Sequence, residues 1–552
     1  MDIAQDSDSN IGSAENSASY DGNIPSLPDD VLYEILSYFK PRDSDQHKDW
    51  KFEKERRQVV QNLRLVCGRF NQIASPHLMD ELIVRIDEQS LAHATRLLET
   101  PLISPGIRSI KVVLAYRPKE IADHIFRFAM LKMEELREIQ RDCSWKLDEY
   151  SSASARGEET PHQLVELYGE AIGNYDTIRE AWKDHLEYGE EQGVHGHFYE
   201  DDGFLEDDIE EQALEEVRPE DEAKFAAYRQ VLQEAHEQYA AKHREQYLLV
   251  KDASFARVLA SSVARSKSSI AISFVDEHMQ NMSRETDAPA LTDKSQLSSF
   301  LLAPSSWGMI WEVDRDALIH TVGVLADLPM ALMKEGIAVK QLKLFCFPVA
   351  GDFPRLKPSV GSWEDLEKAL VHLELFRFEG PSTNRLLVGR WSLPEVEKRS
   401  NLFRYLGAAF MSSALESAHL DAHCLNAVPL HSVFQRIRWP RIKHLFIRNI
   451  CLSQDDISDL CKGIAPAESL DLRWRSFKAV LDLLHEVAVR HQCRVKFKDP
   501  GIFDEKLQAA TDMYLSADKD GRNPLDESLN SPLLWIGDFI EDDSEGTFED
   551  EV

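Results

Sequence analysis

The sequence predicts a mixed α/β protein: a small all-α module at the N-terminus, then an irregular α/β solenoid that is interrupted by a long helical and acidic insertion. Three observations lead to this prediction. Apolar residues recur at helical spacing near the N-terminus, a template of apolar residues repeats through the second half, and an acid-rich run separates two amphipathic stretches between them. At 552 residues, of which 43% are hydrophobic, the chain is long enough for several such parts.

The N-terminal module follows residues 1–23, which are polar and acidic and are predicted to be disordered. Its first helix is expected to begin at Leu27-Pro28-Asp29-Asp30, because proline suits a helix start and the two acids complement the helix dipole. One apolar stripe then comprises Val31, Leu32, Ile35, Leu36 and Phe39, and a second comprises Leu63, Leu65, Val66, Phe70 and Ile73. From spacing alone, an amphipathic helical hairpin that caps a larger domain is the favoured explanation of these stripes.

The same residues carry a family resemblance. The runs LPDDVL from Leu27, ILSYF from Ile35, LRLVCGRF from Leu63 and IASP from Ile73 stand in the order found in the F-box, which residues 24–80 therefore resemble. The resemblance implies a small helical module that docks on the Skp-type adaptor of a cullin–RING ubiquitin ligase. The charged spacer before Leu63 is longer than the family usually carries, and Phe70 stands where many members have Trp. So small a module buries little apolar surface alone, which favours docking on a partner.

The resemblance also implies which residues contact the adaptor. These are Leu27, Pro28, Leu32, Ile35, Leu36, Val66, Cys67 and Phe70. A nucleophilic role for Cys67 is disfavoured, because it lies in an apolar run where a packed small side chain is expected.

Residues 81–117 are interpreted as the start of the repeat-like domain, with alternating apolar residues typical of a half-buried strand at 107–114. Residues 118–252 then change to a helical period and form the predicted insertion. Within it, residues 187–222 are strongly acidic, with Arg218 as the basic residue, and are predicted to be a solvated loop.

The second half repeats the template LxxLxLxxxxL. Its copies begin at Val339, Leu370, Leu415, Ile442 and Ala467, and Val495 with Phe497 closes the series. The last steps are near 25 residues, a period that is similar to that of leucine-rich repeats, with one strand and one helix per unit. We therefore predict a leucine-rich-repeat-like domain at 253–518 that binds the substrate. The usual Asn is replaced by Ile450 in the best copy, and a generic α/β domain with strands at this spacing remains the alternative.

Composition narrows the function further. The formal net charge of −33 disfavours unassisted binding to nucleic acid or to anionic membranes, and it favours basic partners. The seven cysteines are dispersed without a CxxC motif, which is typical of free thiols in a reducing compartment. With no signal peptide and no long apolar span, we expect a cytoplasmic or nuclear protein that does not enter the membrane; residues 519–552 are an acidic C-terminal tail.

No catalytic motif is found in the sequence, so the chain is predicted to be non-catalytic, with no cofactor and no metal. His195, His197, Asp201 and Asp202 have suitable chemistry for a metal. They lie in the acidic run, however, and a solvated loop is the better interpretation.

Basic and aromatic residues on the predicted strands are candidates for target binding. They are Arg377, Lys443, His444, Arg448, Arg473, Trp474, Arg475, Lys496 and Lys498. The concave face of a solenoid suits an extended partner, and arginine forks suit an acidic or phosphorylated segment. Ordinary polar residues beside a core also explain this set, and the acidic loop at 187–222 could instead cover this face within the same chain.

The sequence as a whole is similar to F-box proteins of filamentous fungi, with an F-box followed by irregular repeats. The resemblance implies a substrate-recognition subunit of an SCF-type (Skp adaptor–cullin–F-box) ubiquitin ligase, in which the F-box binds the adaptor and the repeat domain binds a protein target. The alternative is a repeat scaffold or sequestering protein that acts without ubiquitination.

Overall fold

The structure is a computed structural model. The residues that it describes are 28–37, 50–155, 162–191, 219–266, 270–276, 291, 294–314, 316–346, 354–379, 396–421, 433, 437–448, 482, 485, 489, 494–498 and 505–515. The chain divides into two compact units, Met1–Leu78 and Met79–Val552. We call the described part of the first the N-terminal module and the second the sheet domain.

The N-terminal module consists of helices α1 (Asp29–Ser37), α2 (Trp50–Val66) and α3 (Gly68–Ala74), followed by a short 3-10 turn at Ser75–His77. Asp29 and Asp30 occupy the first turn of α1, as the sequence predicts. Helix α2 begins well before Leu63, because the charged spacer from Trp50 onward is rich in Lys, Glu, Gln and Arg, which are good helix formers.

The sheet domain contains one parallel sheet of eight strands in the described part of the chain, and the strands lie in chain order. Their bounds are β1 Glu81–Arg85, β2 Ser109–Val113, β3 Ile270–Val275, β4 Val339–Leu344, β5 Leu375–Glu379, β6 Ser417–Asp421, β7 His444–Arg448 and β8 Arg494–Lys498. Alternate side chains are buried, as in β5, where Phe376 and Phe378 are buried and Arg377 faces the other side. Each strand thus joins its predecessor, which is the order of a solenoid.

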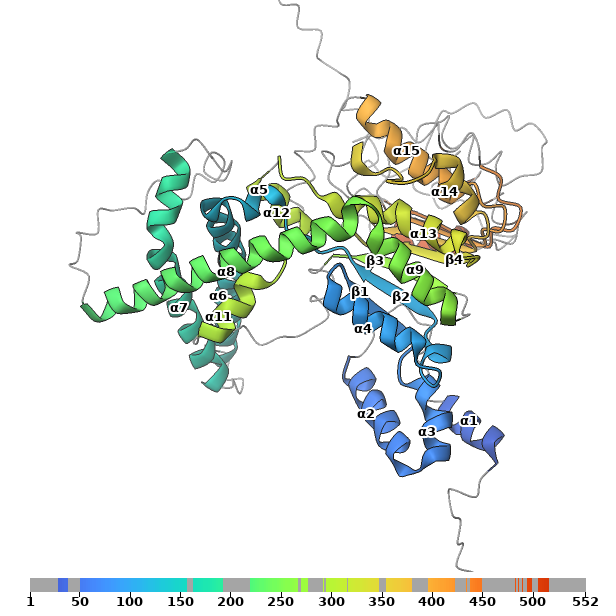
Figure 1. Cartoon of the computed structure of the whole chain (residues 1–552), viewed down its shortest axis with the longest axis horizontal. Helices are drawn as coiled ribbons and strands as arrows, with labels where there is room; N and C mark the ends of the chain where they lie inside the picture. The colour runs from blue at the N-terminus through green and yellow to red at the C-terminus, as the bar shows by residue number, and fades with distance from the viewer. Residues whose placement is uncertain are drawn as a thin grey trace, which may run out of the picture. The chain divides into compact units, whose positions relative to one another are not determined.

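Helices between the strands cover one face of the sheet. They are α4 (Glu88–Glu99), α9 (Ser254–Ser266), α13 (Val324–Lys334), α14 (Trp363–Leu370) and α15 (Val396–Phe410). Each packs against the next, so a row of helices accompanies the row of strands (Figure 1). The core lies between the two layers, where the register partners Ile272, Leu342 and Phe376 are fully buried.

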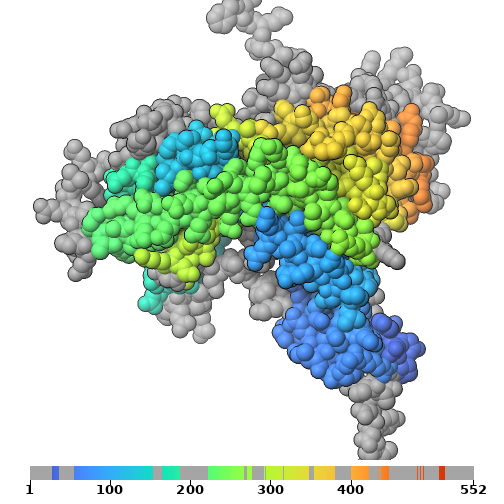
Figure 2. All heavy atoms as spheres, viewed as in Figure 1, coloured from blue at the N-terminus to red at the C-terminus, as the bar shows by residue number. Residues whose placement is uncertain are grey.

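A helical arm leaves the sheet after β2 and returns at β3, and these two strands are paired with each other (Figure 1). It comprises α5 (Lys119–Ala122), α6 (Ile125–Ala155), α7 (His162–Glu191) and α8 (Pro219–Lys251), joined by α11 (Lys294–Leu302) and α12 (Trp307–Val313). With 33 residues, α8 is roughly 50 Å long at 1.5 Å per residue. It forms a continuous ridge in the space-filling view (Figure 2).

The structure corrects several details of the sequence analysis. The helix expected to run on from residue 118 is divided at Asp123 and His124, because α5 packs on α8 whereas α6 packs on α7. Both ends of the predicted acidic loop are helical, since α7 extends to Glu191 and α8 begins at Pro219 with acids in its first turn. The remainder of that loop lies outside the described residues.

The repeat register also differs from the prediction. The template aligns Leu373 with Leu342, but the residue paired with Leu342 in the sheet is Phe376. The template favoured leucine, whereas any large apolar side chain can fill this buried position. Strand β7 pairs directly with β8, through Leu445 and Val495. The copy predicted to begin at Ala467 lies outside the described residues.

Candidate functional site

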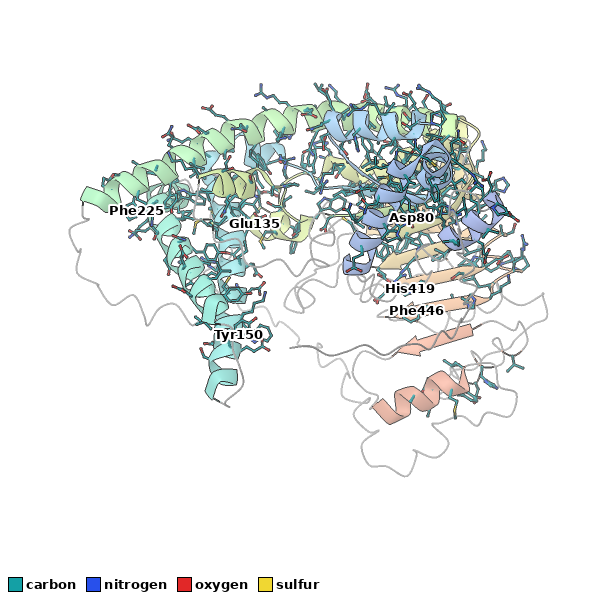
Figure 3. All side chains as sticks on the ribbon, turned by 90° about the horizontal axis from the view of Figure 1, so that it is seen from below. Asp80, Glu135, Tyr150, Phe225, His419 and Phe446 are labelled. Atoms are coloured by element: carbon teal, nitrogen blue, oxygen red, sulfur yellow. The ribbon has the colours of Figure 1, made fainter. Side chains whose placement is uncertain are left out.

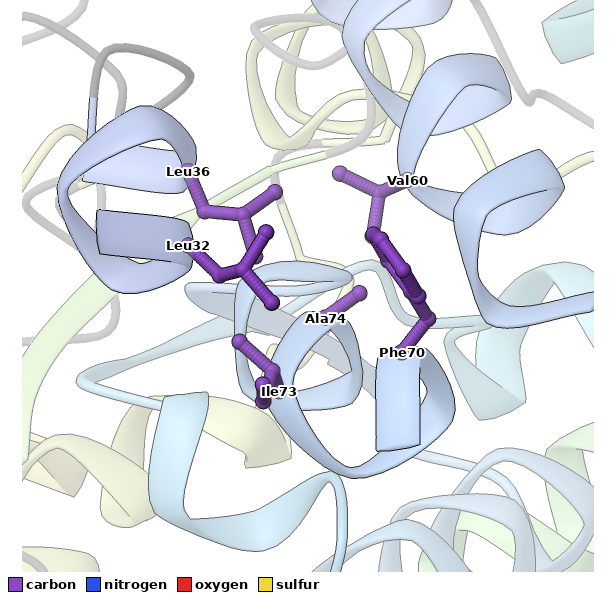
Figure 4. Packing of buried hydrophobic residues seen from close by; sticks show 6 residues of the cluster. All are labelled: Leu32, Leu36, Val60, Phe70, Ile73 and Ala74. Carbon is purple, nitrogen blue, oxygen red and sulfur yellow. The ribbon is translucent and has the colours of Figure 1, made fainter. Parts of the chain in front are cut away.

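The core of the N-terminal module joins its three helices. Leu32 and Leu36 of α1, Val60 of α2, and Phe70, Ile73 and Ala74 of α3 are all buried against one another, as Figure 4 shows. Leu63 and Leu78 pack on this cluster. These side chains therefore hold the module together.

Other apolar side chains of the same helices remain exposed. On α1, Val31 is 39% exposed, Tyr33 49% and Ile35 44%. On α2, Val66 is 59% exposed and Leu65 84%. Covering these side chains would remove apolar area from water, which makes them the candidate contact residues of the module.

Two arginines of the module, by contrast, are engaged within it. Arg64 Nε donates to Asn71 Oδ1 at 3.2 Å and to Ser75 Oγ at 2.9 Å. The Arg69 guanidinium pairs with Asp29 Oδ1 at 2.6 Å and so links α3 to α1. Because these bonds fix the helices, the exposed apolar side chains are presented on a defined backbone.

The residues proposed for adaptor contact fall into two groups. Ile35, Val66 and Cys67 are exposed, as is Pro28 at the start of α1. The other described candidates are in the core, namely Leu32, Leu36 and Phe70, so their side chains stabilise the module and offer no surface to a partner. Leu27 lies outside the described residues. The sequence analysis missed Val31, Tyr33, Val59 and Leu65 as exposed apolar residues of this surface.

A second candidate surface is the face of the sheet opposite the helices. There Arg377 of β5 donates to Glu379 Oε1 at 2.7 Å from its Nε, and its guanidinium lies 5.2 Å from the ring centre of Phe345. His419 of β6 has Nε2 3.3 Å from the same Glu379 oxygen, and its ring lies 4.0 Å from that of Phe446 on β7. Figure 3 labels His419 and Phe446 on these neighbouring strands. We call these five residues the aromatic–charged band.

The predicted target-binding cations are not isolated charges. Arg377 is paired with Glu379, and Lys443 Nζ lies 2.7 Å from Glu416 Oε2. Lys443 holds the pKa of the Glu416 carboxyl below its ordinary value, assisted by Arg441. An acidic target would therefore have to compete with these carboxylates. Arg448 and Lys498 are register partners in β7 and β8, where Lys496 and His444 also lie, while Arg473, Trp474 and Arg475 lie outside the described residues.

Sequence reasoning missed four residues of the band: Phe345, Glu379, His419 and Phe446. The sequence did contain a signal for these four residues, because each stands next to a buried residue in a strand or directly after a strand. Neighbouring residues of a strand point to opposite faces, so these four belong to the face opposite the core. Their pairing across strands, however, depends on the register, which the sequence did not specify.

Within the residues that the structure describes, no group of three or more His, Cys, Asp and Glu side chains is placed to hold a metal ion. His195, His197, Asp201 and Asp202 are not among them. None of the described helices combines the length and the apolar composition needed to cross a bilayer.

Comparison with known proteins gives one match. The family model of the F-box-like domain matches residues 24–85, which include α1 to α3 and β1. No curated protein and no solved structure matches the chain. F-box domains bind Skp-type adaptors, and the match therefore supports a role in ubiquitin-ligase substrate recognition. The family model and the helical module coincide at the N-terminus, so the chain carries an F-box-like domain at residues 24–85, which is followed in the sequence by a parallel α/β sheet domain.

Proposed function

We propose that this protein is the substrate-recognition subunit of an SCF-type ubiquitin ligase. Its F-box-like domain binds a Skp-type adaptor and through it a cullin, and its sheet domain, an irregular leucine-rich-repeat-like solenoid, binds a protein target. The chain itself catalyses no reaction and acts in the cytoplasm, the nucleus or both. It accelerates ubiquitin transfer by holding lysines of the target close to the charged enzyme.

The observation that carries this proposal is the exposed apolar surface of α1 and α2. Ile35, Leu65 and Val66 are each between 44% and 84% exposed. Burying such a side chain from full exposure contributes about 1.5–3 kcal/mol, and each of the three supplies the part of this free energy that corresponds to its exposed fraction. Arg64 and Arg69 are engaged within the domain, so the exposed apolar side chains are the contact residues that we propose.

A charge introduced on this surface tests the adaptor contact. In the double variant Ile35→Asp, Val66→Asp we expect co-purification with the Skp-type adaptor to be lost, because an aspartate cannot be buried there without a partner. The matched control is Gln58→Asp, Gln61→Asp, which adds the same two charges at exposed polar positions of α2 and should bind normally. Helical content by circular dichroism must be unchanged in all three proteins. Undiminished adaptor binding by the double variant would refute the proposed contact.

The F-box resemblance adds a second test at the helix start. Leu27→Ala with Pro28→Ala should abolish adaptor binding and leave the fold intact, since Pro28 is exposed. Co-purified cullin, and ubiquitin transfer to captured targets with the proteasome blocked, separate a ligase subunit from a scaffold. Adaptor binding without cullin would favour the scaffold.

For the target we propose the aromatic–charged band as the contact surface. Its residues combine aromatic rings with a half-buried arginine, which are the side chains that contribute most at protein interfaces. Affinity purification with mass spectrometry identifies the proteins that bind the unaltered chain. With Phe446→Ala, at least one of these proteins should no longer be captured, while the adaptor still is. The same set captured by both proteins would exclude the band as the target surface.

A further inference from the structure

A cluster of polar and aromatic side chains lies where β2 ends and the helical arm begins. Its members come from the segment after β2, from α5, from α8, from the 3-10 turn His320–Gly323 and from the turn before α14: Tyr116, Glu120, His243, Tyr247, His320 and Arg355. The ring centre of Tyr116 lies 5.8 Å from that of His243 and 5.9 Å from that of His320, and the ring centre of Tyr247 lies 5.3 Å from that of His320. The cluster is separate from the adaptor surface and from the aromatic–charged band.

The backbone that carries Tyr116 is held by side chains from three elements. Gln246 of α8 accepts from the Arg117 N–H at 3.2 Å and donates to the Ala115 carbonyl at 3.2 Å. The Leu114 carbonyl accepts from Trp307 Nε1 at 3.0 Å and from the Thr321 hydroxyl at 3.1 Å. Tyr116 is therefore fixed in place before any ligand arrives, which lowers the entropic cost of binding.

The hydrogen bonds also determine which ring nitrogen carries the proton in His243 and in His320. His243 Nδ1 lies 2.6 Å from the Arg117 carbonyl, which can only accept, so Nδ1 carries the proton. Arg355 Nη1 lies 3.3 Å from His320 Nδ1, and a guanidinium can only donate, so the proton of neutral His320 is on Nε2. His320 thus has a donor to offer, as do Tyr116 and Tyr247.

The Tyr116 hydroxyl is the observation that points to a ligand. Its side chain is 0% exposed, and the hydroxyl has no hydrogen-bond partner among the described residues. Burial, followed by the nearby Glu120 carboxylate, raises the pKa of Tyr116, so the group stays a hydroxyl and a donor. A buried donor without an acceptor costs about 1–3 kcal/mol, and an arriving acceptor recovers this free energy.

The donors of the cluster, rather than its net charge, favour a ligand rich in acceptor oxygens. Arg355 supplies a cation, and the Glu120 carboxylate already accepts from the Leu318 N–H at 3.2 Å. Arg355, Tyr116, Tyr247 and His320 each carry a donor, and they come from four different segments of the chain. Four donors from separate segments can be shared among the several oxygens of a phosphate, whereas a carboxylate offers only two oxygens.

We propose that this cluster binds the phosphate group of a small soluble molecule, with Arg355 and the Tyr116 hydroxyl as its principal ligands. Tyr247, His320 and Arg355 are half-buried and border solvent, whereas Tyr116 and His243 lie beneath them. Entry past three half-buried side chains favours a small molecule over a folded partner. The Glu120 carboxylate repels a dianion, so replacing it with an uncharged residue should strengthen binding.

Inorganic phosphate is the first probe, used with the full chain at constant ionic strength set by chloride. Isothermal titration calorimetry should detect phosphate binding to the unaltered chain, and Tyr116→Phe should weaken it about tenfold or more, the usual worth of a hydrogen bond to a charged group. The matched control is Tyr239→Phe, which removes another buried hydroxyl without a partner in the described part of the arm. It should bind phosphate normally.

Further variants keep the proposal open to refutation. Glu120→Gln should bind phosphate several-fold more tightly, because a repelling charge is removed, and Arg355→Gln should not bind it. Phosphate-free Tyr116→Phe should unfold at the same temperature as the unaltered chain or slightly above it. Equal phosphate affinity of Tyr116→Phe and the unaltered chain, or no binding to either, would overturn the proposal. A phosphoserine peptide that binds more tightly than phosphate, and loses this on Tyr116→Phe, would overturn the choice of a small molecule.

Discussion

Among single residues, His320 has the imidazole most affected by its surroundings. Burial, then the Arg355 guanidinium and His243, lower its pKa from 6.5 to about 4. The unfolded chain takes up this proton near the ordinary pKa, whereas the folded chain does so only near pH 4. The unfolded state therefore binds more protons between these values, and the fold loses stability as the pH falls through this window.

Replacing His320 should reduce that loss. We expect His320→Asn to lose on the order of 2 kcal/mol less stability between neutral pH and pH 4 than the unaltered chain, a value that allows for partial exposure of the ring. Urea unfolding of the sheet domain at the two pH values measures the difference. The control is His372→Asn, at an exposed position of the same domain, which should leave the pH dependence unchanged. Identical pH profiles for His320→Asn and the unaltered chain would contradict the assignment.

Among the elements, α14 shows a complete N-terminal capping box. Ser362 Oγ accepts from the Asp365 N–H at 3.3 Å, and Asp365 Oδ2 accepts from the Ser362 N–H at 3.1 Å. Gly361 precedes them at φ 118°, a conformation that side chains rarely adopt. The cap thus fixes both the start of the helix and the direction of the chain that enters it.

Loss of this cap should destabilise α14 selectively. Ser362→Ala is expected to cost about 1 kcal/mol, visible as faster hydrogen exchange in α14. Ser413→Ala, at an exposed turn after α15, serves as the comparison and should leave exchange in α14 unchanged. If exchange in α14 is equally slow in Ser362→Ala, the capping box does not determine the stability of this helix.

The elements also show where sequence reasoning succeeds and where it stops. Alternation located β2, and helical spacing located the region of α6, α7 and α8, because local periodicity reflects one buried face. It could not decide between the stripes Leu32–Leu36 and Val31–Ile35, since both have i, i+4 spacing and only packing on α3 determines which is buried. Ser362 and Asp365 have capping-box spacing but were missed. Glu379 and His419 meet only through strand register.

At the scale of the whole molecule, the F-box-like domain and the sheet domain form separate compact units. A unit as small as residues 28–78 has little stability of its own, so an adaptor that covers its apolar surface also stabilises it. The two units are therefore expected to respond separately to substitutions in their cores.

Two core substitutions test this independence. Leu32→Ala should cost about 2–5 kcal/mol and abolish hydrogen-exchange protection in α1 to α3, with protection in the sheet unchanged. Leu342→Ala, at a fully buried position of β4, should have the opposite pattern. Loss of protection in both units from either substitution would show that they fold as one.

The side chain of Gln246 occupies, for the end of β2, the place that another stretch of main chain would otherwise take. Deleting the helical arm would consequently remove Gln246 and leave the buried Arg117 N–H and Ala115 carbonyl without this hydrogen-bond partner. Any trimmed version would need substitute donors and acceptors at Ala115 and Arg117. The part of the arm that contains Gln246 is thus needed to complete the hydrogen bonding after β2. Deletions in the arm should therefore be confined to residues far from Gln246.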